Sequence, residues 1–108
     1  MLHQDIDDAS FARKVLDSTL PVAVLFCGPW CRLCDKAGPL MDDVARSYAG
    51  KVKVAKIDLD RNRRTAKRFG IRALPALLLF KRGRLVDAIL GLRPKAEIRQ
   101  MLDGLLTA

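Results

Sequence analysis

The feature that most constrains the fold is a short apolar run that ends just before a pair of cysteines. The run comprises Val22, Ala23, Val24, Leu25 and Phe26. Its nearly unbroken hydrophobicity is typical of a central strand whose two faces are both covered by other elements. The sequence Trp30-Cys31-Arg32-Leu33-Cys34 follows after a tight turn and leads into a segment compatible with a helix. We therefore expect both cysteines at a strand-to-helix junction.

Two cysteines separated by two residues at such a junction form a candidate redox site. A thiol at a helix N-terminus meets the positive end of the helix dipole and several free backbone N–H groups, which favour the nucleophilic thiolate. Cys31, at the start of the helix, is therefore the candidate nucleophile. Cys34 would lie roughly one turn further on, close enough to attack a mixed disulfide, and should be more buried and less acidic.

Two other interpretations of the cysteines stay open at this level. They could be merely packed in the core. Alternatively, Cys27, Cys31 and Cys34 could be three ligands of a zinc or iron–sulfur site, although one chain offers no obvious fourth ligand. We expect neither of these, and we expect no metal and no separate cofactor.

The size of the chain and its N-terminal charge indicate the class of protein. With 108 residues, half of them apolar, the chain has the usual size of one domain, and we expect residues 1–108 to form it. No apolar run approaches the ~20 residues needed to span a bilayer. Asp5, Asp7 and Asp8 stand where a signal peptide would be basic and then apolar. We therefore expect a cytoplasmic protein with no membrane association.

The charge of the chain is strongly positive. The 20 Lys and Arg residues exceed the 12 Asp and Glu residues, so that the net charge is +8. Such a charge attracts acidic molecules over a Debye length. The densest run of cations lies between Arg61 and Arg72, and only Phe69 interleaves it with an aromatic ring. This run is most simply a solvated basic face; acidic protein partners are the next interpretation, and nucleic acid is not the expected partner.

The remaining pattern predicts the order helix, strand, helix, strand, helix, strand, strand, helix. The predicted elements are a helix over 8–18, a strand over 22–27, a helix over 31–48, a strand over 52–59, a helix over 61–69, strands over 76–80 and 85–90, and a C-terminal helix that begins at Pro94. Pro39 lies inside the second helix and should kink it. The crossover through that helix has a suitable length for parallel pairing, and the last two strands form a hairpin.

In its motifs the chain resembles the thioredoxin family over nearly its whole length. The resemblance is carried by the Trp-Cys-x-x-Cys motif with Pro39 five residues later, by residues 54–58, by the run from Phe69 through Pro75 to Gly83, and by Gly91. It implies the thioredoxin fold, an α/β fold with three α/β/α layers in which helices flank a central mixed β-sheet. It also implies a cis peptide bond between Leu74 and Pro75 that faces the cysteines.

The resemblance further implies an activity and a site. It implies a thiol-disulfide oxidoreductase that reduces protein disulfides and contributes to cell redox homeostasis. Cys31 would attack, Cys34 would resolve the intermediate, and a thioredoxin reductase would reduce the resulting disulfide. The redox-active cysteine pair would be the only redox group. Carried over by position, the residues that would line the substrate groove are Trp30, Ala73, Leu74, Pro75 and Gly91.

The two residues between the cysteines depart from the usual pattern of the family. Arg32 and Leu33 stand where thioredoxins usually carry Gly-Pro. At ~7 Å and an effective dielectric of about 40, the Arg32 charge would favour the Cys31 thiolate by roughly 1 kcal/mol. Because a stabilised thiolate stabilises the reduced form, we expect a pair that is more oxidising than in ordinary thioredoxins.

Two buried positions also depart from that pattern. Leu25 stands where the family usually buries an aspartate that relays a proton to or from the second cysteine. Lys56, Asp58 or Asp35 could replace it as the proton handler, and the sequence does not choose among them. Cys27 stands where many thioredoxins have a tryptophan. It is either a small apolar residue at a strand end or a third redox thiol that forms a dimer or pairs with Cys31.

These departures keep other functions open beside the general reductant. One is a more oxidising isomerase or oxidase, or a donor to one dedicated partner. Another is a binding module that uses the scaffold without catalysis and docks through its basic face. The reduction potential separates the first of these from a reductant, and activity without cysteines would indicate the second.

Overall fold

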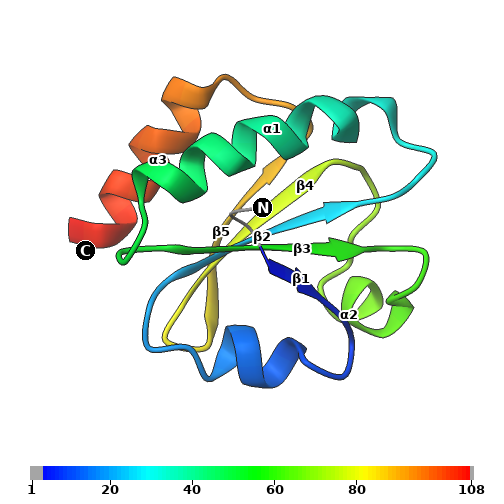
Figure 1. Ribbon diagram of the computed structural model, residues 1–108. Coiled ribbons are helices and arrows are strands. Elements are labelled where there is room, and N and C mark those ends of the chain that lie inside the picture. Colours follow the sequence, from blue (N-terminus) through cyan, green and yellow to red (C-terminus); the bar gives the residue numbers. More distant parts are fainter. Residues whose placement is uncertain (1–3, 108) are drawn as a thin grey trace.

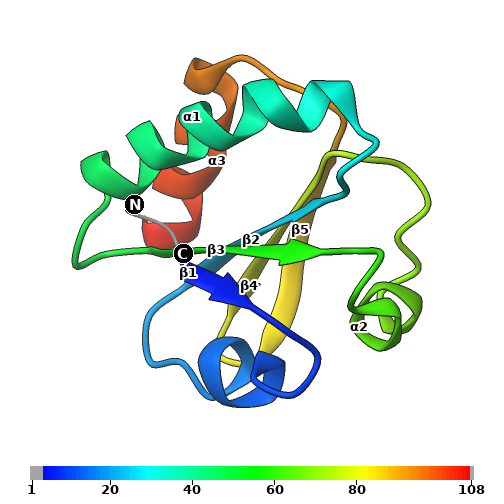
Figure 2. The ribbon, with the colours of Figure 1, turned by 45° about the vertical axis from the view of Figure 1, so that its right-hand side comes forward.

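The computed structural model describes residues 4–107 and consists of a five-stranded mixed sheet between two layers of helices (Figure 1). The strands are β1 (Gln4–Ile6), β2 (Val22–Cys27), β3 (Lys53–Asp58), β4 (Ala76–Lys81) and β5 (Arg84–Leu90), in the spatial order β1-β3-β2-β4-β5. The helices are the π-helix η1 (Ala12–Leu16), α1 (Arg32–Ser47), α2 (Arg63–Arg68) and α3 (Lys95–Thr107). Helices α1 and α3 cover one face of the sheet, and η1 and α2 lie on the other (Figures 1 and 2). The expected three-layer α/β/α fold is confirmed.

Strand β2 is the centre of the sheet. All six of its residues are buried, and it pairs in parallel with β3 and antiparallel with β4. Because side chains alternate along a strand, β2 contributes to both cores. Ala23, Leu25 and Cys27 belong to the core beneath α1 and α3, and Val22, Val24 and Phe26 to the core on the opposite face. Burial of a large apolar side chain contributes about 1.5–3 kcal/mol, so this strand is expected to be a main source of stability.

Helix α1 begins and ends almost where the sequence predicts. Cys31 is its N-cap residue and Tyr48 its C-cap residue, and the helix continues through Pro39. The kink expected at Pro39 stays a prediction. The parallel crossover from β2 through α1 to β3 is confirmed, and it places the start of α1 at the C-terminal end of β2 (Figure 1).

The hairpin of β4 and β5 is also confirmed. The two residues at its turn, Arg82 and Gly83, have φ angles of 54° and 78°. Two successive positive φ angles are the signature of a type I′ turn, whose twist matches that of the flanking strands. A Cβ atom on Gly83 would lie 3.0 Å from the carbonyl oxygen of Leu16, so glycine is required there for conformation and for space.

The prediction for the N-terminal segment was wrong in two respects. Residues 4–6 form β1, a strand parallel to β3 that was not predicted, and the helix expected over 8–18 contains only one π-helical stretch. The N–H of Asp17 donates to the carbonyl of Ala12, five residues earlier, so the backbone follows the wider π register. Before it, Asp7 and Ser10 close a turn through reciprocal side-chain hydrogen bonds of 2.8 and 3.0 Å. Their hydrogen-bonding capacity is therefore used in the turn, and neither caps the helix.

Asp8 caps a distant helix. Its carboxylate accepts hydrogen bonds from the backbone N–H of Thr65 at 2.9 Å and that of Arg64 at 3.3 Å, and from the Thr65 hydroxyl at 2.5 Å. The Asp8 N–H donates to the Asn62 side chain at 2.8 Å. These bonds, the one from the Thr65 hydroxyl first, lower the pKa of the Asp8 carboxyl. The segment after β1 is thereby tied to the N-terminus of α2.

Replacement of Asp8 by alanine should lower the free energy of unfolding by about 1 kcal/mol near pH 7, the usual value of a helix cap. Because folding lowers the pKa of this carboxyl below 3.8, the stabilisation is present above the unfolded pKa and is lost as the pH falls through the folded pKa. The difference in unfolding free energy between the wild-type and the Asp8→Ala protein should therefore shrink below about pH 4. Urea unfolding across this range measures it. Asp17→Ala is the control for charge, and a difference that persists unchanged at low pH would contradict the capping role of the carboxylate.

Candidate functional site

The two cysteines of the motif lie where β2 passes into α1. The sulfur of Cys31 accepts a hydrogen bond from the backbone N–H of Cys34 at 3.3 Å, so the thiol occupies the place of a capping oxygen. The N–H of Cys31 donates to the Gly28 carbonyl at 3.1 Å and holds the intervening turn closed. A negative charge on this sulfur would face the free N–H groups and the positive end of α1. The sulfur of Cys31 therefore lies where the helix would stabilise an anion.

Cys34 has a different electrostatic environment. It is 6% exposed and Cys31 is 8% exposed, so the expected difference in burial is small. Burial raises the pKa of the Cys34 thiol well above its ordinary value, and its hydrogen bonds with Cys31 and Cys27 raise it further, against a smaller opposing effect of the Gly28 backbone. Cys34 is therefore protonated near neutral pH and needs a proton acceptor before it can attack.

A cavity of about 260 Å³ adjoins Cys34. Its lining consists of Cys27, Gly28, Pro29, Cys34, Asp35, Lys56 and Asp58. The three side chains expected as alternative proton handlers, Lys56, Asp58 and Asp35, therefore meet at one cavity. Strand pairing places Cys27 opposite Asp58. Cys34 therefore adjoins polar and ionisable side chains as well as the apolar core.

Leu25 lies away from this cavity. It is 4% exposed and belongs to the core beneath α1, where strand pairing sets it opposite Lys56. Leu25 and Lys56 also line a second, smaller pocket against α1. An acidic side chain at this position would therefore be buried next to the Lys56 residue.

The loop before β4 approaches the same end of β2. The peptide bond between Leu74 and Pro75 is cis, as expected. Strand pairing sets Ala76 opposite Phe26, so Pro75 lies beside the C-terminal end of β2. The Gly91 N–H donates to the Pro75 carbonyl at 2.8 Å and joins the end of β5 to this loop. Of the residues expected in a substrate groove, Pro75 is buried, Leu74 and Gly91 are half-buried, and Ala73 is exposed.

Trp30 lies at the surface but is held in place. Its side chain is 63% exposed, and its Nε1–H donates to both carboxylate oxygens of Asp60 at 3.0 and 3.1 Å. A Cβ atom on Gly28 would lie 3.1 Å from the indole and 3.3 Å from Leu74, so the absence of a side chain there lets both approach the turn. The backbone N–H of Asp60 donates to the Asp58 carboxylate at 2.9 Å. Trp30 is thus connected to the lining of the cavity.

Asp60 is the site residue that sequence reasoning missed. Its only signal is its place just after β3, next to the carboxyl end of β2 in the sheet. Arg32 and Leu33, the two residues between the cysteines, are both exposed. Their side chains are therefore available to a docked partner and contribute little to the core.

The described residues form neither a metal-binding cluster nor a membrane-spanning helix. Within residues 4–107, no group of three or more His, Cys, Asp or Glu side chains is arranged to hold a metal ion. Over the same part of the chain, the helices are too short or too polar to cross a membrane.

Comparison with known proteins assigns this arrangement to a family. A family model described as Thioredoxin matches residues 3–104. Thioredoxin of Synechocystis sp. is 45% identical over 101 residues, which cover 94% of each chain. Thioredoxin 1 of Nostoc sp. is 42% identical over 98 residues, or 91% of this chain and 92% of the relative. Thioredoxin M-type, chloroplastic, of Pisum sativum is 38% identical over 93% of this chain and 58% of its own length.

Removal of the Asp60 carboxylate should free the indole of Trp30. Because Trp30 is the single tryptophan, its fluorescence reports this change directly. We expect Asp60→Ala to lower the fluorescence anisotropy and to raise quenching by the neutral quencher acrylamide. Loss of one exposed, charge-assisted hydrogen bond should lower the free energy of unfolding by about 1 kcal/mol at most. Asp60→Asn keeps an acceptor and is the matched control; unchanged anisotropy in Asp60→Ala would refute the tether.

Proposed function

The chain belongs to the thioredoxin family and is a thiol-disulfide oxidoreductase that reduces protein disulfides; on this premise we propose that Cys31 is its attacking thiol and Cys34 its resolving thiol. The observation that carries this assignment is the hydrogen bond from the Cys34 N–H to the Cys31 sulfur at the N-cap of α1. It supports a thiolate on Cys31 and keeps Cys34 one helical turn away.

In the proposed reaction the Cys31 thiolate attacks one sulfur of a partner disulfide. A mixed disulfide forms, and the other partner sulfur leaves as a thiolate that takes up a proton. Cys34 then loses its proton and attacks the sulfur of Cys31, which releases the second partner thiol. The partner gains two electrons and two protons, and the chain keeps a Cys31–Cys34 disulfide. The polar cavity beside Cys34 supports a route for the second proton.

We propose that the partner chain lies between Trp30 and the loop of Ala73, Leu74 and Pro75, with Gly91 at its far side. The support is the tethered indole on one side of the cysteines and the cis-proline loop at the end of β2 on the other. An extended polypeptide could form main-chain hydrogen bonds with the backbone of such a loop, whatever the amino-acid sequence of that polypeptide. A groove of this kind suits a reductant that acts on many proteins.

The proposal includes further partners and a location. A thioredoxin reductase would return the disulfide to the dithiol, and a reducing compartment such as the cytoplasm would keep the pair active. We also propose that residues 1–108 form one domain, which is supported by one sheet with a core on each face. No part of the reaction requires a metal or a separate cofactor.

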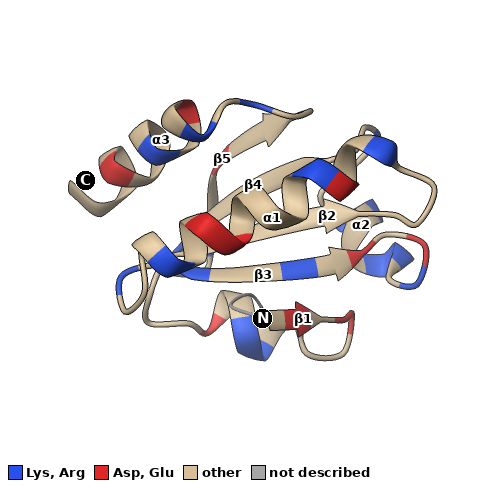
Figure 3. Cartoon of the chain, turned by 45° about the horizontal axis from the view of Figure 1, so that its top comes forward, with Lys and Arg blue, Asp and Glu red and all other residues tan. Residues whose placement is uncertain are grey.

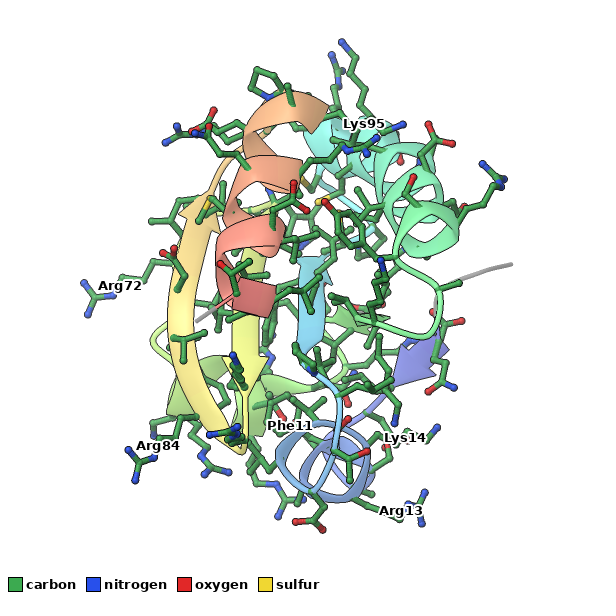
Figure 4. The ribbon with its side chains drawn as sticks, turned by 90° about the vertical axis from the view of Figure 1, so that its left-hand side faces the viewer. Phe11, Arg13, Lys14, Arg72, Arg84 and Lys95 are labelled. Carbon is green, nitrogen blue, oxygen red and sulfur yellow. The ribbon has the colours of Figure 1, made fainter. Side chains whose placement is uncertain are left out.

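Acidic protein partners are proposed on the strength of the surface charge. Lys and Arg crowd α2 and η1 (Figure 3), and Arg13 and Arg72 extend outward from the body of the chain (Figure 4). Arg32 and Arg93 are exposed close to the cysteines and to Gly91. These charges would speed encounters with acidic substrates, and the gain would fall as ionic strength rises.

Two cysteine variants test the proposed roles. Cys31→Ser should reduce no protein disulfide, because the attacking sulfur is gone. Cys34→Ser should attack once and accumulate a mixed disulfide between Cys31 and the substrate, visible on non-reducing gels and by peptide mapping. A Cys31→Ser chain that still reduces protein disulfides at the wild-type rate would overturn the assignment. Full biological activity of the double Ser chain would instead indicate a binding module.

The Arg32 charge should make the pair more oxidising. If Arg32 stabilises the Cys31 thiolate by roughly 1 kcal/mol, Arg32→Ala should lower the reduction potential by about 20 mV, since 30 mV corresponds to about 1.4 kcal/mol. Equilibration with glutathione measures this value. Lys51→Ala removes a charge beyond the far end of α1 and is the control. Equal potentials in all three chains would show that solvent screens Arg32, and a wild-type value near −270 mV would place the chain among ordinary thioredoxins.

Restoration of an acid at position 25 should speed the second step. In Leu25→Asp the new carboxylate could accept the Cys34 proton, so we expect faster resolution of a mixed disulfide in stopped-flow experiments. Burial of a polar group in place of leucine should lower stability by roughly 2–5 kcal/mol. Leu25→Asn is equally polar but cannot accept the proton, and it should lose stability without gaining speed. If Leu25→Asp resolved the mixed disulfide no faster than wild type, the proton-relay argument would fail.

A further inference from the structure

The proposed reaction uses two thiols, but the site contains three. Cys27 ends β2, Cys31 caps α1 and Cys34 lies in the first turn of α1. All three are free, and all three are buried in the core beneath α1. Cys27 and Cys34 also line the same cavity. A third thiol therefore shares a cavity with the resolving cysteine.

Cys34 is the thiol that adjoins both of the others. Its backbone N–H donates to the Cys31 sulfur at 3.3 Å, and its side chain lines the same cavity as that of Cys27. Two cysteines that share a cavity need only a small approach and side-chain rotation to form an S–S bond of about 2.05 Å. The sequence offers Cys31 as the partner of Cys27, whereas the shared cavity, which Cys31 does not line, favours Cys34. Cys34 can therefore form a disulfide in either of two directions.

We propose that Cys27 is a second disulfide partner of Cys34, so that the oxidised chain interconverts between a Cys31–Cys34 and a Cys27–Cys34 disulfide. The Cys27 thiolate attacks the Cys34 sulfur, the Cys27–Cys34 bond forms, and the Cys31–Cys34 bond breaks. Cys31 leaves as a thiolate and takes up the proton that Cys27 gave to the cavity. The number of electrons does not change, so the exchange needs no external oxidant. The inference rests on the proposed function, because it starts from the disulfide which that function produces.

The surroundings favour the departure of Cys31 and slow the attack by Cys27. Cys31 is a good leaving group because its thiolate faces the N-terminus of α1. Burial raises the pKa of the Cys27 thiol, while its bond with Cys34 and the positive charge of Lys56 oppose that rise, and Asp35 reinforces it. The exchange follows release of the substrate, because it starts from the Cys31–Cys34 disulfide that resolution forms.

The second disulfide changes the redox equilibrium in a calculable way. Let K be the equilibrium ratio of the Cys27–Cys34 isomer to the Cys31–Cys34 isomer. The total concentration of oxidised chain is then 1 + K times the concentration of the Cys31–Cys34 isomer. Cys27 therefore makes the dithiol a stronger reductant by the same factor. It also returns Cys31 to the thiol form while the chain is still oxidised.

The labelling experiment uses the wild-type chain. The oxidised protein is quenched in acid, its one free thiol is blocked with a maleimide, and the product is digested with trypsin. Cleavage after Arg32 leaves Cys27 and Cys31 together on residues 15–32 and Cys34 on residues 33–36. Both isomers give the same cross-linked mass, and fragmentation shows which cysteine carries the label. We expect label on both Cys27 and Cys31; label on Cys27 alone overturns the inference and leaves the proposed function intact.

Failure of the proposed function would look different, because no disulfide to Cys34 would then form in the wild-type chain. A second variant isolates the new bond. Cys31→Ser, equilibrated with glutathione disulfide, should lose two hydrogens in an internal Cys27–Cys34 bond, whereas the Cys27→Ser, Cys31→Ser chain should only carry glutathione. A persistent glutathione adduct on a folded Cys31→Ser chain contradicts the inference.

A third variant tests the redox consequence. Cys27→Ser should weaken the dithiol as a reductant by the factor 1 + K, where K is obtained from the ratio of label on Cys31 to label on Cys27. If label appears on Cys31 but the redox equilibrium of Cys27→Ser with glutathione equals that of wild type, the redox role is overturned.

Discussion

The whole arrangement depends on β2 being buried on both faces. The strand is paired on both edges, and its side chains enter two cores, so its C-terminal end can move little relative to the rest of the sheet. Cys27 ends this strand, and the cap of α1 follows after a short turn closed by the bond from Cys31 to Gly28. The loop of Pro75 is placed against the same end by the pairing of β4. A reactive thiol is thus held on a rigid support although the residues around it are exposed.

The site separates an apolar side from a polar one. Leu25 belongs to the apolar core beneath α1. The polar groups Lys56, Asp58 and Asp35 gather at the cavity that adjoins Cys34, which Leu25 does not line. A buried carboxylate at Leu25 would be costly to desolvate, whereas the same chemistry at a cavity open to water costs little. The chain therefore combines a stable core with the polar cavity that we propose as the route of the proton.

Much of the architecture was predictable because it rests on strong local signals. The apolar run of β2, the cysteine cap and the glycine turn of the hairpin each act over a few neighbouring residues. β1 escaped prediction because three residues carry no periodicity, and its pairing with β3 depends on contacts distant in sequence. The π-helical register of η1 is likewise set by packing of Phe11 and Val15 into the core, not by helix propensity.

The sequence by itself determined the redox motif, the strand-to-helix junction that presents it and the family that such a motif indicates. These follow from residue types and short spacings, because capping, turn formation and burial of an apolar run are local effects. Only the tertiary structure decided what surrounds the cysteines. Three features join elements that are distant in the sequence: the tether of Trp30 by Asp60, the capping of α2 by Asp8, and the cavity that Cys27 and Cys34 share. The separation of these elements in space depends on how the sheet and its helices pack. The spacing of residues along the sequence does not encode such distances, because the volumes of the side chains packed between the elements set them.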